Sequence, residues 1–129
     1  MRTLTVALAA LALSAAPAAA KAAIYIFDAI LTGPNEFPPV PSPGTGTGHI
    51  VFDDIAHTMS VDIDFAGLLF PTTVAHIHAP TDVAGVGLAG VATTTPSFPG
   101  FPAGVTSGSY AATFDMSLAS SYRAGFLTL

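Results

Sequence analysis

The feature that most constrains the fold is a strict alternation of apolar and polar residues between positions 59 and 65. The apolar set is Met59, Val61, Ile63 and Phe65, and the polar set is Ser60, Asp62 and Asp64. Successive side chains of a β-strand point to opposite faces, so this pattern predicts a strand with one buried face and one solvated face. A chain built on such strands needs a second layer to cover the apolar face.

The preceding run, residues 48–53, alternates in the same way and is separated from the first by residues 54–57, a plausible hairpin turn. For both apolar faces to meet one core, even positions of the first run must face odd positions of the second. The register that satisfies this condition gives three facing pairs: Phe52 with Met59, Ile50 with Val61, and, on the outer face, His49 with Asp62.

Further short β-type segments occur along the chain. Residues 24–31 are β-branched and aromatic, residues 109–115 alternate with Tyr110, Ala112 and Phe114 predicted inward, and residues 91–95 are a candidate edge strand. Proline- and glycine-rich stretches lie between them, and residues 118–122 are expected to form a helical turn. Short strands without a long helical period predict an all-β fold, an antiparallel β-sandwich.

The first 20 residues have the plan of a secretory signal peptide. Arg2 gives a positive start, residues 4–13 are apolar, and the stretch ends in small residues at Ala18–Ala20. The apolar core is about ten residues long, whereas a membrane span takes about 20. We therefore expect residues 1–20 to be a signal peptide and residues 21–129 to be the mature domain, without a stable membrane span.

Composition limits the partners. The chain has no cysteine, so disulfides and thiolate metal sites are excluded. After cleavage it keeps two basic residues, Lys21 and Arg123, against eight acidic ones, for a net charge of −6. This charge disfavours nucleic acid and anionic membrane surfaces. A cysteine-free exported domain fits the periplasm or the extracellular space.

Two histidines stand at positions i and i+2 in the stretch from Val74 to Pro80. If this stretch is a strand, His76 and His78 share one face, while Ala75 and Ile77 face the core. Two neutral imidazoles on one face can supply half of a four-coordinate shell for Zn or Cu.

A larger metal cluster is predicted on one condition. If the histidine strand neighbours the strand that carries the aspartates, the same face gathers His76, His78, His49, Asp62 and Asp64. The alternative is that the two histidines alternate with core residues and bond to loop backbone. No nucleophile with an assignable base is evident, so no catalytic residue is predicted.

Several motifs, in order, resemble the CHRD domain, a module named from chordin and found in microbial secreted proteins. They are Leu31-x-Gly33 followed by Glu36-x-Pro38-Pro39-Val40, then Phe65-Ala66-Gly67-Leu68, then Ala75-His76-Ile77-His78-Ala79-Pro80. The resemblance covers roughly residues 27 to 115. It implies an immunoglobulin-like or superoxide-dismutase-like sandwich.

The family pattern continues with a second histidine segment and a closing Gly-Glu-Ile-Arg-Gly. Neither is found before Leu129, so we expect a domain incomplete at its C-terminal end.

These observations predict a secreted or periplasmic, non-enzymatic binding or structural module without a required cofactor. Its partner is expected to be a protein or a glycan. The alternative function is metal binding by His76 and His78.

Overall fold

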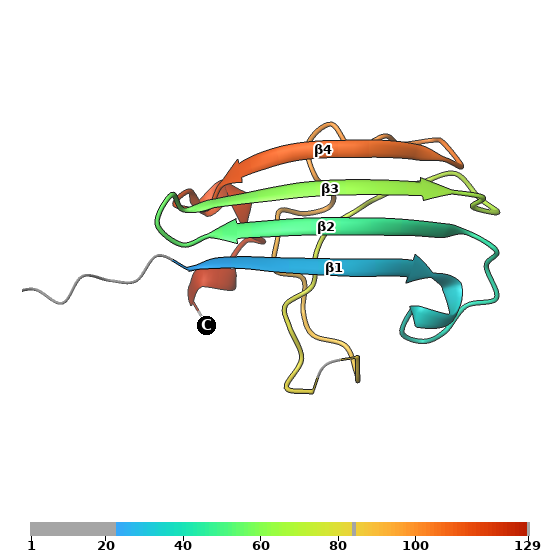
Figure 1. Ribbon diagram of the computed structural model, residues 1–129, viewed down its shortest axis with the longest axis horizontal. Helices are drawn as coiled ribbons and strands as arrows, with labels where there is room; N and C mark the ends of the chain where they lie inside the picture. Colours follow the sequence, from blue (N-terminus) through green and yellow to red (C-terminus); the bar gives the residue numbers. More distant parts are fainter. Residues whose placement is uncertain (1–22, 84, 129) are drawn as a thin grey trace, which may run out of the picture.

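The computed structural model describes residues 23–83 and 85–128, and its main element is a four-stranded antiparallel sheet of order β1-β2-β3-β4 (Figure 1). The strands are β1 (Ile24–Thr32), β2 (Thr45–Asp53), β3 (Thr58–Ala66) and β4 (Gly108–Asp115). Single-turn 3-10 helices are η1 (Gly33–Asn35), η2 (Ala119–Ser121) and η3 (Phe126–Thr128). The predicted signal peptide lies outside the described residues.

The register between β2 and β3 confirms the prediction from alternation. Its facing pairs include Phe52 with Met59, Ile50 with Val61, and His49 with Asp62. The register follows from burial, because a slip by one residue would turn the apolar side chains of both strands toward water. The same rule extends to β4, where Ala112 faces Val61 and Phe114 faces Met59.

The core lies under β2, β3 and β4. Met59, Val61 and Tyr110 on the sheet are buried together with Phe98 from the opposite layer. Ala75 and Ile77 pack against this cluster from the same opposite layer, as predicted. Met59 and Val61 on the inner face are almost completely buried, and their burial stabilises the fold.

The second layer consists of extended segments of the chain between β3 and β4, which cross behind the sheet (Figure 1). The prediction of an all-β sandwich is therefore confirmed. Within the described residues, no helix is long and apolar enough to cross a membrane.

Two segments of this layer were predicted to be strands, and that prediction was wrong. Residues 74–80 and 91–95 are extended but form only isolated bridges, at His78–Val91 and Thr93–Tyr122. Side chains interrupt the ladder: the N–H of Ala75 donates to the Ser97 hydroxyl at 3.0 Å, and that of Ile77 to the Thr93 hydroxyl at 2.8 Å. Hydroxyl acceptors thus take positions that a regular ladder gives to backbone carbonyls.

Candidate functional site

A groove of about 770 Å³ lies between the inner face of the sheet and the histidine segment. Its floor includes Ile50 and Ile63 from the sheet, and its walls include Ala75 and Phe37 from two loops. Most of its lining is apolar, while Glu36 and His76 add titratable groups. Apolar concave surfaces with a few polar groups are typical of binding sites.

The inner face of β1 is exposed because the core does not extend under this strand. Register places Tyr25 and Phe27 on the same face as Phe52 and Ile50, yet they are 53% and 56% exposed. By contrast, Met59 on the same face is 1% exposed. The opposite face of β1 also carries exposed apolar side chains, at Ile24, Ile26 and Ile30, with Asp28 between them.

The edge position of β1 adds to this exposure. In the sheet order, β1 has β2 on one side and no strand on the other among the described residues. An edge strand presents unpaired backbone N–H and C=O groups that can pair with an added strand. Within the part of the chain that the structure describes, β1 therefore combines an edge without a neighbouring strand and exposed apolar side chains on both faces.

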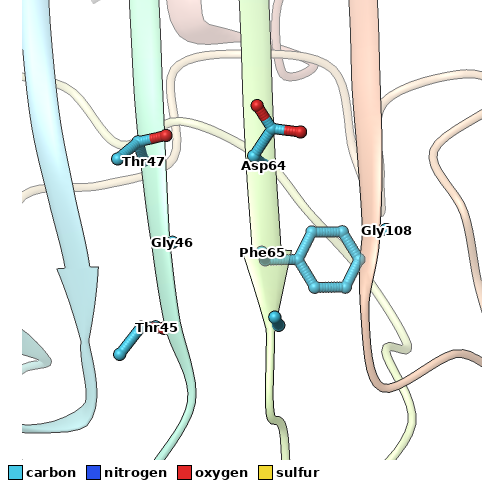
Figure 2. Close-up of a pocket in the computed structure, with 7 residues that line it drawn as sticks. Thr45, Gly46, Thr47, Asp64, Phe65 and Gly108 are labelled. Carbon is cyan, nitrogen blue, oxygen red and sulfur yellow. The ribbon is translucent and has the colours of Figure 1, made fainter.

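A shallower hollow of about 330 Å³ lies where β2, β3 and β4 meet (Figure 2). One register row there reads Gly46, Phe65 and Gly108. Figure 2 shows the Phe65 ring directed toward Gly108. A Cβ atom at position 108 would lie 3.1 Å from Cζ of this ring, so a side chain there would be crowded. Thr47 and Asp64 also line the hollow, but most of its lining is apolar.

His76 and His78 lie close together in the second layer. Their ring centroids are 5.1 Å apart and the ring planes are tilted by 53°. The Nδ1 atom of His76 is 3.0 Å from the Pro96 carbonyl oxygen, and that of His78 is 2.7 Å from the Ala89 carbonyl oxygen. The pairing of the two rings on one side of the segment agrees with the prediction.

The other predicted metal ligands lie elsewhere. His49, Asp62 and Asp64 are on the outer face of the sheet, and the histidine segment does not join that sheet. The condition for a five-residue cluster is therefore not met. In residues 23–83 and 85–128, no three His, Cys, Asp or Glu side chains are arranged to hold a metal ion.

His49 instead contacts a residue that the sequence reasoning missed. Its Nδ1 is 2.6 Å from an Asp28 carboxylate oxygen, because Asp28 is its facing partner on β1. Both side chains are more than half exposed. The register between β1 and β2 would have predicted this pair. Together with the β2–β3 register, it places Asp28, His49 and Asp62 side by side on three neighbouring strands.

Two groups outside the groove have shifted pKa values. Hydrogen bonds from the Ser117 hydroxyl and backbone N–H lower the pKa of Asp115. Burial raises the pKa of Tyr110, whose hydroxyl donates to the Pro99 carbonyl at 3.0 Å. Both groups fix loops that border the core, and neither lines the groove.

A family model described as CHRD domain matches residues 27–127. The chain belongs to the CHRD family. This family consists of secreted or extracellular modules. No curated protein and no solved structure matches the chain.

The structure explains one motif of this CHRD chain. Gly33 is buried at the end of β1, and a Cβ there would meet the backbone of Ser42 at 2.8 and 2.9 Å as well as the Val40 carbonyl oxygen. The Gly33 carbonyl accepts the N–H of Glu36 at 3.2 Å and that of Val40 at 2.9 Å. This close approach folds the proline-rich loop back and forms one end of the groove.

Proposed function

We propose that this CHRD chain is a secreted or periplasmic, non-enzymatic binding module that holds an extended segment of a protein partner along β1. The observation that carries the proposal is the exposure of β1 on both faces. Strand addition to a sheet edge is a recurring mode of peptide recognition, in which backbone hydrogen bonds give affinity and side-chain pockets give specificity.

The exposed apolar side chains of β1 lie on both of its faces. Five β1 side chains, Ile24, Tyr25, Ile26, Phe27 and Ile30, are each more than half exposed. Tyr25 and Phe27 lie on one face of β1, and Ile24, Ile26 and Ile30 lie on the other. At about 80–100 Å² for each side chain, the two faces present roughly 160–200 and 240–300 Å² of exposed apolar surface.

A protein segment fits this surface better than a glycan or a nucleic acid. The free edge of β1 matches the backbone of another strand, and the flanking side chains are aliphatic or aromatic. The acidic net charge, −6 after removal of residues 1–20, disfavours nucleic acid and favours a neutral or basic partner segment. The signal-like residues 1–20 and the family support export.

The test is site-specific photo-crosslinking in the cell envelope of the producing organism. Benzoylphenylalanine replaces Phe27 on β1, and the matched control replaces Thr113, which is exposed on the outer face of β4. We expect a discrete adduct at position 27 that is absent at position 113, with the crosslink on an extended segment of another protein.

A second variant tests the apolar faces. Tyr25→Ser combined with Ile26→Ser should abolish adduct formation at position 27 while leaving the far-UV circular dichroism spectrum unchanged, because both side chains are more than half exposed. Equal adducts at positions 27 and 113, no adduct at all, or an adduct only with a second copy of the chain would refute the proposal.

A further inference from the structure

We propose that His76 and His78 form an open binding site for a divalent transition-metal ion, with Cu(II) bound more tightly than Zn(II). This inference is independent of the strand-binding function, because it rests on the imidazoles of the second layer and not on β1.

The local fold orients both rings toward the same side of the segment. Ala75 and Ile77 pack against the core, so the alternating positions 76 and 78 point away from it. His78 is exposed and His76 is half-buried. A metal ion from solvent can therefore reach them.

Hydrogen bonds determine which ring nitrogen is available. A carbonyl oxygen only accepts, so the Nδ1 atom that contacts it must carry the proton. This holds for His76 at the Pro96 carbonyl and for His78 at the Ala89 carbonyl. In the neutral rings, both Nε2 atoms therefore keep a free lone pair, the form in which imidazole binds metals.

The Pro96 and Ala89 carbonyls occupy the place of the hydrogen-bond acceptors that orient ligating histidines in known metal sites. A ligating histidine usually donates its other N–H to a carbonyl or carboxylate, which fixes the ring and raises its basicity. Here both contacts exist before any metal binds, at 3.0 Å and 2.7 Å. The two rings therefore do not need to lose much conformational freedom on binding.

The separation of the rings matches a shared metal ion. A metal–nitrogen distance of about 2.0–2.1 Å places a metal about 3.2 Å from each ring centre, so two rings stand about 4.5 Å apart at the 90° angle of a tetragonal Cu(II) site and about 5 Å apart at a tetrahedral angle. The observed centroid separation is 5.1 Å. Two imidazoles leave the remaining coordination positions to water or external ligands. Nitrogen ligands of this kind favour Cu(II) over Zn(II).

The test is calorimetric titration of the purified chain with CuCl₂ and, separately, ZnCl₂. The test variants are His76→Asn, His78→Asn and the double variant, because the Asn amide can replace the Nδ1 donor while removing the Nε2 ligand. The matched control is His49→Asn/His57→Asn, which removes the other two histidines of the chain. Asn suits the positive φ of 51° at position 57.

We expect one Cu(II) per chain in the wild type. Each single variant should weaken binding at least about tenfold, because the second imidazole no longer adds an intramolecular contact. The control should bind like the wild type. In the metal-free chain, long-range ¹H–¹⁵N correlations should show His76 and His78 protonated at Nδ1.

Three results would overturn the proposal. One is wild-type affinity in the folded double variant, and another is an equal loss of binding in the His49/His57 control. The third is the absence of Cu(II) binding to a wild-type chain with a native circular dichroism spectrum. The tautomer measurement separates a misplaced ring from a correctly placed ring that does not bind metal.

Discussion

Two glycines on β2 should respond in opposite ways to the same substitution. Gly46 and Gly48 share the inner face of the strand, and neither has a positive φ. A Cβ at position 46 would clash with the Asp64 carbonyl oxygen and lie 3.2 Å from the Cα and Cβ atoms of Phe65. A Cβ at position 48 would meet only Ile50 Cδ1 at 3.6 Å and Ala29 Cβ at 3.8 Å, which are ordinary contacts.

The expected magnitudes follow from these contacts. Gly46→Ala forces β2 and β3 apart, and such overpacking costs about 1–3 kcal/mol. Gly48→Ala fits the space and should stabilise by about 0.5–1 kcal/mol, because alanine loses less chain entropy on folding. The free energies of unfolding of the two variants should therefore differ by roughly 1.5–4 kcal/mol, with Gly46→Ala the less stable.

Urea unfolding measures this difference. The chain has no Trp, so far-UV circular dichroism is the suitable probe. Both variants should keep the wild-type denaturant slope and shift only the midpoint. If Gly46→Ala unfolds at the same urea concentration as Gly48→Ala, or at a higher one, the close approach of β3 to Gly46 is not what requires glycine there.

Other expectations concern the core and two shifted groups. Met59→Ala should cost about 2–5 kcal/mol in a urea titration, since the side chain is 1% exposed. Tyr110→Phe removes the bond to the Pro99 carbonyl and should cost about 0.5–1.5 kcal/mol. Burial raises the pKa of Tyr110, so its contribution to stability is full below about pH 10 and is lost as pH rises through the raised pKa. The free energy of unfolding of Tyr110→Phe should therefore fall less steeply at alkaline pH than that of the wild type. The lowered pKa of Asp115 gives the opposite sign: its contribution is full above about pH 4 and lost as pH falls, so Asp115→Asn should flatten the acid limb. Unchanged limbs in these two variants would contradict the assigned causes.

The β2–β3 hairpin could be predicted from the sequence because alternation and burial act on the same residues. A strand with Met59 and Val61 inward has one register that also puts Ile50 and Phe52 inward. The inward side of β4 followed from the same argument, and Tyr110 is buried as expected. Local pattern and global packing agree in this part of the chain.

The histidine segment could be predicted only in part. Alternation correctly placed Ala75 and Ile77 against the core. It could not show that the hydroxyls of Thr93 and Ser97 replace backbone acceptors, because these residues lie 16 and 22 positions along the chain from their donors. Side-chain acceptors of this kind leave no periodic trace in the sequence.

The prediction of a five-residue metal cluster was wrong, and the reason for this also supports the two-histidine site at His76 and His78. The cluster required the histidine segment to lie beside β3 in one sheet, and the segment lies instead in the opposite layer. The same displacement places the segment beside residues 89–96, whose carbonyl oxygens at Ala89 and Pro96 hold the two Nδ1 atoms. Without the aspartates the site lacks carboxylate ligands, while the two carbonyls accept from Nδ1 and leave the Nε2 atoms of both rings free. A site of this kind should favour a metal that tolerates two nitrogen ligands and exchangeable water over one that needs carboxylates, so Ca²⁺ and Mg²⁺ should not compete with Cu(II) for it.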